Sequence, residues 1–491
     1  MKGSFLFAAI AMAALTGCAV GPRYKAPVVK TPAAFAQAAG QNMAQDTAAL
    51  AEWWTTFGDE ELSSLVRRTI ANNLDVKIAR ARLGEARASL RHTQASKELP
   101  AGNFNGTYAR SKTSLDNPQI PKLGGGSLIP NTYGSYQPYF DASYELDLFG
   151  GVRRQVEAAS AEAQSYEENL RNTLVSAVAE VARDYLQLRQ NQEQLATARR
   201  TLASREDTLK ITQVRYKAGL VTDLDLANAA ANVASTQSAI PTLESNAAQM
   251  IHAIAVLLGQ NPEDLSGELK GEGALPSAPA EIPVGLASDL LRRRPDIRQA
   301  ERSLAASTAQ IGVQVASLFP SISLTGQYGG QSGHVLNLVN AAARFYTLGP
   351  HIKWGLLNYP STKANIRTYE AKRDQQYLTY QKTVLTAFQD VENALISYSK
   401  DKERRASLEE QVNQYRRAVD VALTRYTKGL TNFLDVLDAQ RSLYAAEDSL
   451  VQSRAAIDID LVTLYKALGG GWERNDPVSR NESGQKRGTS R

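Results

Sequence analysis

Carboxylates that follow a glycine turn by a few residues are the pattern in this sequence best suited to act on a solute. Asp225 follows Gly219, and both Asp435 and Asp438 follow Gly429. Near a helix start such carboxylates stabilise the helix dipole, whereas copies gathered around a pore repel one another and favour cations. The pattern alone favours the first role. Whether the carboxylates also line a pore depends on the helices and strands that position them.

Other candidates for chemistry are poor. The four histidines lack metal-ligand spacing, and one cysteine, Cys18, cannot form a paired thiol site. The sequence also contains no phosphate-binding loop and no compact catalytic constellation. We therefore expect no enzyme, no cofactor and no metal site. The histidines are His92, His252, His334 and His351.

The acidic positions belong to a segment that occurs twice. Residues 215–220 read Arg-Tyr-Lys-Ala-Gly-Leu, and residues 425–430 read Arg-Tyr-Thr-Lys-Gly-Leu, about 210 positions later. Each copy ends a long helical run. A second matching pair, at 73–76 and 294–297, opens a helix in each half. The sequence therefore predicts an internal tandem repeat, which usually indicates an architectural role.

Each repeat is predicted to contain a short helix, a strand pair, a long helix and another short helix. Repeat 1 covers residues 59–258, repeat 2 covers 285–468, and a linker at 259–284 joins them. The polar, aperiodic tail at 469–491 is expected to be disordered.

Long helices are the main predicted element, so the expected fold class is α+β with mostly helix. They are expected at 151–217 and 361–428, each roughly 100 Å long at 1.5 Å per residue. Apolar residues recur every seven positions in both, which predicts left-handed supercoiling. Two short helices placed end to end would match one long helix and allow a hollow cylinder. The short helices are expected at 59–99, 222–258, 286–318 and 432–468.

Two strand pairs, at 103–149 and 321–358, alternate apolar and polar residues, most clearly from Tyr136 to Leu148. This pattern is typical of a membrane-spanning β-barrel and equally of a half-exposed soluble sheet, so the strands alone leave both open. Four strands cannot close a barrel. Two copies would give a barrel filled by side chains, whereas three would give about twelve strands and a lumen.

The amino terminus reads as an export signal. Lys2, the apolar run at 5–15 and the small residues before Cys18 have the three regions of a signal peptide, and the run is too short to span a membrane. Leu15-Thr16-Gly17-Cys18 also resembles a bacterial lipoprotein cleavage box. That resemblance implies a signal peptide at 1–17 and a lipidated Cys18, palmitate included, opening segment 18–58. An ordinary signal peptide with an incidental cysteine is the alternative.

Charge and composition exclude some classes of partner. The 491 residues carry a formal net charge of +5 and no basic block of nucleic-acid-binding strength, so no nucleic acid is expected. With one cysteine, an exported chain has no disulfide and depends on packing.

Several motifs together resemble the TolC-type outer-membrane factors, and among them the NodT/OprM-like lipoprotein branch of resistance-nodulation-division multidrug efflux systems. The resemblance implies a homotrimer with a twelve-stranded barrel in the outer membrane and a periplasmic α-helical coiled-coil barrel. It also implies two partners, a periplasmic adaptor and an inner-membrane transporter of that class. The motifs are Gly285 to Glu301, Glu145 to Gly150, Pro22 with Tyr24 and Pro27, and Phe433 to Ala439.

The resemblance also implies roles for the residues near the glycine turns. Leu434, Asp435 and Asp438 match positions that narrow the periplasmic aperture. Tyr426 and Asp225 match a tyrosine-to-acid link that holds the entrance shut, although the loop before Asp225 differs from the family's.

The favoured function is therefore an outer-membrane exit duct for drugs or other small molecules, anchored in the outer membrane and extending into the periplasm. Three alternatives stay open at the level of sequence. Two are ducts with other cargo, namely metal-ion export and type I protein secretion. The third is a periplasm-spanning structural lipoprotein that conducts nothing.

Overall fold

The computed structural model describes residues 19–30, 32, 35–36, 43–44, 50–112, 122–123, 126–127, 132–276, 282–283 and 289–473. The predicted signal peptide, Cys18 and residues 474–491 lie outside this described part. The described chain is mainly helical with a four-stranded sheet, as predicted, and it forms two compact units. Unit 1 comprises Met1–Pro27, Gly84–Gln164 and Glu301–Thr379, and unit 2 comprises Val28–Leu83, Ser165–Ala300 and Tyr380–Arg491.

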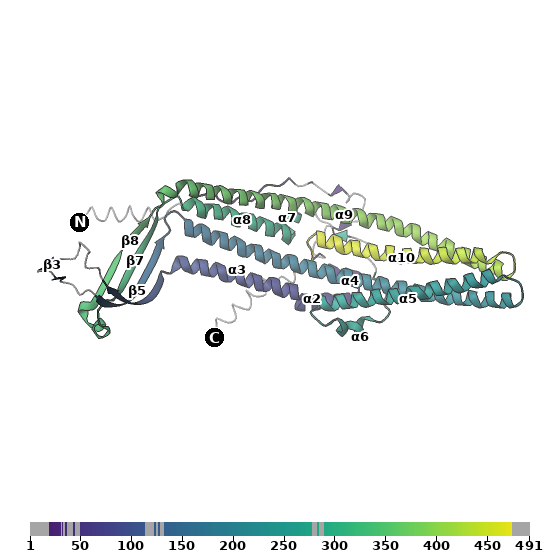
Figure 1. Ribbon diagram of the computed structural model, residues 1–491. Helices are drawn as coiled ribbons and strands as arrows, with labels where there is room; N and C mark the ends of the chain where they lie inside the picture. The colour runs from purple at the N-terminus through teal and green to yellow at the C-terminus, as the bar shows by residue number, and fades with distance from the viewer. Residues whose placement is uncertain are drawn as a thin grey trace, which may run out of the picture. The chain divides into compact units, whose positions relative to one another are not determined.

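Unit 1 contains the sheet, which is antiparallel throughout with the order β2-β5-β7-β8 (Figure 1). A two-residue ladder of β3 with β4 lies in the loop between β2 and β5. The strands are β2 (Ala101–Lys112), β3 (Lys122–Leu123), β4 (Gly126–Ser127), β5 (Thr132–Leu146), β7 (Ser321–Gly330) and β8 (Arg344–Lys353).

The register of this sheet separates an apolar row from a polar one. Phe104, Phe140, Tyr328 and Tyr346 lie opposite one another across the four strands, and their exposed fractions are 63%, 62%, 56% and 81%. One residue further along, Asn103, Asp141, Gln327 and Thr347 form the matching row on the other face. Because side chains alternate along a strand, a single chain leaves a whole aromatic face uncovered.

The second strand pair ends earlier than predicted, at residue 353 and not at 358. β8 ends at Lys353, and Trp354 then donates its indole N–H to the carbonyl of Leu318 at 3.0 Å. A 3-10 turn, Leu356–Asn358, follows directly before α9.

Helices make up most of the described chain. α4 and α9 have 67 and 69 residues, and α5 and α10 have 35 each. α9 begins two residues before the predicted start because Pro360 is tolerated in a first turn. The helices are α2 (Glu60–Asn72), α3 (Leu74–Glu98), α4 (Gly151–Lys217), α5 (Asp223–Leu257), α6 (Ser266–Leu269), α7 (Leu290–Arg293), α8 (Pro295–Ala316), α9 (Tyr359–Thr427) and α10 (Phe433–Ala467).

None of the described helices has the length and apolar character needed to pass through a membrane.

The core of unit 2 lies along the seven-residue seam of the long helices. Leu174, Val181 and Leu188 of α4 and Val391 of α9 are at most 1% exposed. Beside them Trp53, in the 3-10 turn Trp53–Phe57, stacks on Tyr465 with ring centroids 5.1 Å apart.

Three segments of unit 2 differ from the sequence expectation. The helix expected at 59–99 breaks at Asn73, which separates α2 from α3. The linker contains the 3-10 turn Pro262–Leu265 and α6, whose leucines Leu265 and Leu269 are buried, and Ile282–Pro283 (β6) pairs with Met43–Ala44 (β1). The first residues of the expected tail are also packed, since Trp472 donates to the carbonyl of Arg293 at 3.3 Å.

Candidate functional site

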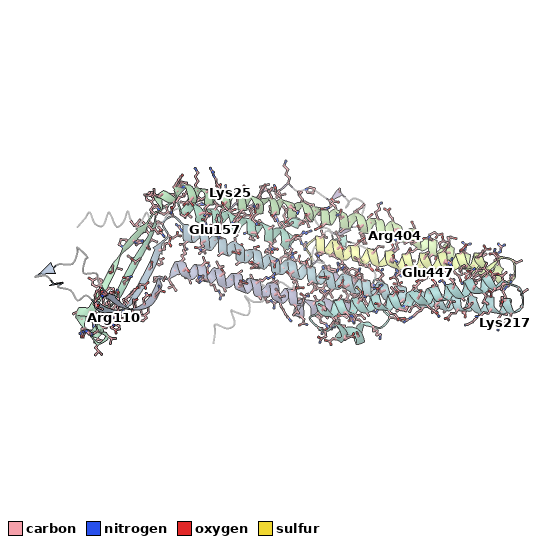
Figure 2. All side chains as sticks on the ribbon, in the orientation of Figure 1. Lys25, Arg110, Glu157, Lys217, Arg404 and Glu447 are labelled. Carbon is pink, nitrogen blue, oxygen red and sulfur yellow. The ribbon has the colours of Figure 1, made fainter. Side chains whose placement is uncertain are left out.

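The two glycine turns have the same backbone geometry. Gly219 and Gly429 have φ of +71° and +73°, the left-handed region that glycine adopts without steric cost. In each turn the N–H of the following leucine bonds to the carbonyl five residues back, at 2.9 Å for Leu220 and 2.8 Å for Leu430. This is a Schellman motif, and it reverses the chain from a long helix into a short one. Lys217, labelled in Figure 2, is the last residue before the first turn.

Each short helix then starts at a polar cap. Thr222 and Asp225 form a capping box, in which the backbone N–H of Thr222 donates to the Asp225 carboxylate at 3.0 Å. At the second turn Asn432 accepts from the N–H of Asp435 at 3.2 Å, and the Asp435 carboxylate accepts from the Thr431 hydroxyl. The Asp225 carboxylate therefore satisfies a free N–H group at the first turn, and the Asn432 side chain does so at the second. Both carboxylates complement the helix dipole.

The predicted aperture residues lie together on the exposed face of α10. Leu434, Asp435 and Asp438 are exposed, and their spacing of one, three and four residues places them on adjacent parts of one helix face. The intervening side chains pack inward. Phe433, Val436 and Leu437 are at most 3% exposed and form a cluster with Tyr426 and Ala229.

The predicted link between Tyr426 and Asp225 is not formed in this chain. The Tyr426 side chain is 1% exposed, and its hydroxyl donates to the Thr212 hydroxyl at 3.3 Å. Asp225 is occupied by its capping box. The single hydroxyl hydrogen of Tyr426 is already donated to Thr212, so no donor is left for a direct bond to Asp225.

Arg215 joins the two hairpins instead, which the sequence reasoning missed. Its guanidinium donates to the carbonyls of Tyr426 and Thr427, at 2.7 and 3.1 Å, and lies 4.7 Å from the Tyr426 ring centroid. A cation at a helix C-terminus is favourable because the last carbonyls carry partial negative charge. The signal available in the sequence was the arginine that precedes the tyrosine in both copies of the motif.

A second cluster lies where short helices meet end to end. Asn73, before α3, donates to the carbonyl of Leu257 at the end of α5, at 2.9 Å. Arg294, before α8, donates to the carbonyl of Ala467 at the end of α10, at 3.1 Å. The two junctions are equivalent in the repeat, because Leu257 and Ala467 are both the final residue of a 35-residue helix.

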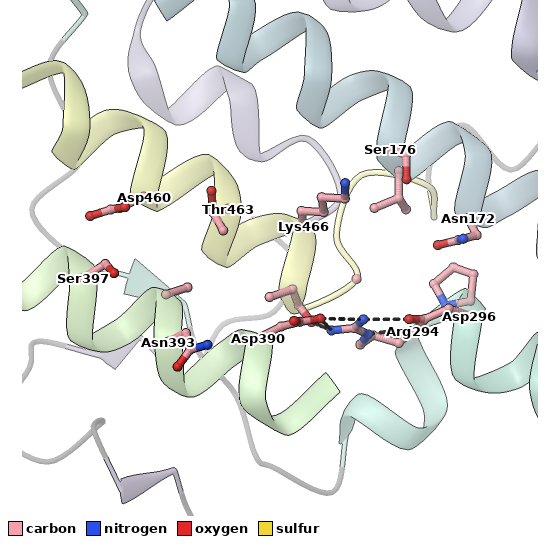
Figure 3. A pocket seen from close by; sticks show the side chains of 15 residues that line it. Asn172, Ser176, Arg294, Asp296, Asp390, Asn393, Ser397, Asp460, Thr463 and Lys466 are labelled. Carbon is pink, nitrogen blue, oxygen red and sulfur yellow. Dashed lines mark hydrogen bonds and ion pairs between the residues drawn. The ribbon is translucent and has the colours of Figure 1, made fainter. Parts of the chain in front are cut away.

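The Arg294 junction opens into a cavity of about 540 Å³. Figure 3 shows Arg294 between Asp296 and Asp390, to which its nitrogens donate at 2.6 and 3.0 Å. Asp460 also lines this cavity. Burial raises the pKa of the Asp460 carboxyl to about 7, and the neighbouring Asp401 carboxylate contributes to the shift. Among the described residues, no group of three or more His, Cys, Asp or Glu side chains is arranged to hold a metal ion.

Comparison with known families shows where this architecture belongs. The sequence model of the outer membrane efflux protein family matches residues 65–260 and 286–470. The chain belongs to the outer membrane efflux protein family. The sequence prediction of an outer-membrane efflux protein is therefore confirmed.

Individual members of the family match over nearly the whole chain. Nodulation protein T of Rhizobium leguminosarum bv. trifolii is 32% identical over 467 residues, 95% of this chain and 96% of that protein. The antibiotic efflux pump outer membrane protein ArpC of Pseudomonas putida is 32% identical over 483 residues, 96% of each. The solved outer-membrane channel OprN has 35% identity and a TM-score of 0.85, covering 93% of this chain and 100% of that one.

Proposed function

We propose that this efflux protein is the exit duct of a tripartite pump, which passes drugs or other small molecules to the exterior. A periplasmic adaptor and an inner-membrane transporter of the resistance-nodulation-division class would deliver the cargo. The proposal is supported by family membership and by a full-length likeness to an efflux pump protein and a channel. The proposed role is transport, without an enzymatic step or a cofactor in this chain.

The observation that carries the proposal is the uncovered aromatic face of the sheet. Phe140, Tyr328 and Tyr346 are each more than half exposed although they lie side by side on neighbouring strands. An apolar face of this kind needs lipid or protein to cover it. Three copies would supply twelve strands, with the aromatic row toward lipid and the Asp141 row toward a wet lumen.

The helical hairpins would form the periplasmic end of the duct. Three copies of Leu434, Asp435 and Asp438 around an axis would give an apolar constriction beside rings of negative charge. Such rings favour cations and resist complete closure because the carboxylates repel one another. Tyr426 would hold the closed entrance through Thr212 and Arg215, in place of the link to Asp225.

The lipid anchor and the internal repeat are two further features of the proposed duct. We propose that Cys18 carries the lipid anchor in the outer membrane after removal of residues 1–17. We also propose that 59–258 and 285–468 are tandem repeats, supported by the equal lengths of α5 and α10 and by the matched glycine turns.

Substitutions at two adjacent residues, on opposite faces of β7, test whether one face of the sheet contacts lipid. Tyr328→Arg places a charge on the lipid-facing row, where it costs roughly 2–4 kcal/mol, whereas Gln327→Arg places the same charge in the wet lumen. In cells that lack the native gene, Gln327→Arg should restore export of a fluorescent dye and Tyr328→Arg should not. Folded protein in the outer membrane is measured in parallel. Equal behaviour of the two variants would contradict a lipid-facing sheet.

A further inference from the structure

The contact of Arg215 with Tyr426 joins one helical hairpin to the other within a chain. Arg215 lies in the last turn of α4 in the first repeat, and Tyr426 lies in the last turn of α9 in the second. The guanidinium binds two carbonyl oxygens and covers the tyrosine ring, so it fixes both the position and the rotation of the α9 terminus.

The repeat supplies the same two residue types a second time, in exchanged places. The counterpart of Arg215 is Arg425, and the counterpart of Tyr426 is Tyr216. Arg425 is exposed and Tyr216 is 41% exposed, and neither side chain makes a hydrogen bond, ion pair or ring contact with any residue in the described part of the chain. The pair of Arg215 and Tyr426 is therefore in contact within the chain. The side chains of Arg425 and Tyr216, at the same end of the hairpins, remain available to another copy.

Other polar contacts between the hairpins are not repeated. Gln440 donates to Thr208 at 2.9 Å, but the counterparts of these residues are alanines, Ala230 and Ala418. Gln194 donates to Asp448 at 2.7 Å, and its counterparts are an arginine and a serine, Arg404 and Ser238. The arginine and the tyrosine at the turn thus occur in both repeats, whereas the residues of these other contacts occur in only one.

We infer that the Arg425 side chain binds Tyr216 of the neighbouring copy in the assembled protein. The rotation that carries the first hairpin onto the second carries Arg215 onto Arg425 and Tyr426 onto Tyr216 of the next chain. The Arg425 guanidinium then donates to the carbonyls of Tyr216 and Lys217 of that chain and covers its tyrosine ring. The inference rests on the proposed trimeric duct, and it closes a ring of three in-chain and three between-chain contacts at the entrance.

The two kinds of contact differ in one respect. Thr212, which accepts the Tyr426 hydroxyl, has Ala422 as its counterpart, so the Tyr216 hydroxyl gains no equivalent bond. A lost hydrogen bond makes the between-chain contact the weaker of the two. The entrance therefore separates first between chains, and each chain's own pair of hairpins moves as one body.

Crosslinking tests the arrangement. The double variant Arg425→Cys, Tyr216→Cys, treated with a short bifunctional maleimide in outer-membrane fractions, should give covalent trimers on a denaturing gel. The matched double variant Arg215→Cys, Tyr426→Cys should give crosslinked chains of monomer mass. The parent, whose lipidated Cys18 has no free thiol, and each single variant should give neither product.

The contrary outcomes separate this inference from the duct itself. Intact trimers that crosslink within chains at 215 and 426 but never between chains at 425 and 216 would overturn the inference and leave the duct standing. Folded chains that remain monomeric would overturn both.

A second measurement avoids reliance on the cysteines. Arg425→Ala should raise the open probability in planar bilayers at least roughly tenfold, because the loss of even one of these charge-assisted hydrogen bonds corresponds to a change of about that size. Arg425→Lys keeps the charge but loses the planar fork and should restore the closed state only in part. An unchanged open probability in Arg425→Ala would overturn the inference.

Discussion

Two acidic residues at the turns have a structural duty that can be separated from a role in permeation. The Asp225 carboxylate caps α5, and the Asp435 carboxylate accepts from the Thr431 hydroxyl beside the Asn432 cap of α10. Asp438 is exposed one turn further on. Asparagine keeps most of the capping geometry and removes the charge. Substitution by asparagine therefore tests the charge alone.

We predict that Asp435→Asn, Asp438→Asn lowers cation selectivity. With the rings neutralised, the reversal potential in a KCl gradient should move toward zero, because the constriction no longer excludes anions. Asp225→Asn serves as the control and should leave the reversal potential unchanged. A shift of equal size in the control would place the selectivity elsewhere.

The pair of Asp460 and Asp401 predicts a pH dependence of stability. A carboxyl with a pKa of about 7 in the folded chain, against about 3.9 when unfolded, binds its proton more tightly when folded. The burial penalty is thus fully present above pH 7 and is relieved as the pH falls from about 7 toward 4. Heat resistance of the purified protein should rise over that range.

Two variants isolate this effect. Asp460→Asn should be more heat-resistant than the parent at pH 8 and should lose most of the rise on acidification. Asp401→Asn removes the neighbouring charge and should move the rise to lower pH. If Asp460→Asn keeps the parent's full pH dependence, another group is responsible.

The sequence predicted which residues share a helix face, but not which side chains contact one another. The motif predicted that Leu434, Asp435 and Asp438 lie together, because spacing along a helix fixes which residues share a face. It failed for Tyr426, whose partner Thr212 lies 214 positions away in the chain. Which neighbouring helix faces a side chain depends on packing that one segment does not encode.

At the scale of elements, the glycine turns carry the largest local constraint. An alanine at Gly219 or Gly429 must adopt positive φ, which costs about 1–2 kcal/mol. Gly84, inside α3 with open space around it, is the matched control, and Gly84→Ala should gain roughly 0.5–1 kcal/mol. Thermal midpoints of the three variants measure this contrast. Equal shifts at all three sites would show that the turns are not constrained.

The sequence predicted helices and strands well where a residue pattern extended over many positions. It predicted them less well where a single residue sets a boundary or a contact. The four-stranded sheet followed from alternation, and the mainly helical character from the seven-residue repeat. The helix start at 73–76 was predicted, but the segment 59–99 was still expected as one helix. It is two, because the Asn73 side chain caps α3 at Val76, a local bond that outweighs continuation of α2. Packing of Trp472 was missed because a polar tail gives no periodic signal.

At the scale of the whole molecule, the sheet and the hairpins are each incomplete in one chain. The aromatic face lacks a cover, and among the described residues none forms a hydrogen bond, ion pair or ring contact with the side chains of Arg425 and Tyr216. Both deficits are removed if copies associate around one axis, as the efflux family suggests. A motif within one segment could not predict those contacts, because their partner atoms belong to another copy; they follow only from the repeat and from the unclosed sheet.

Single-channel conductance of the purified, lipidated protein in planar bilayers tests the central claim most directly. We predict small, cation-selective openings from inserted trimers, and more frequent openings in Arg215→Ala, which frees the Tyr426 helix end. Correctly inserted trimers that never conduct, in the parent or in Arg215→Ala, would contradict an exit duct and leave a structural lipoprotein.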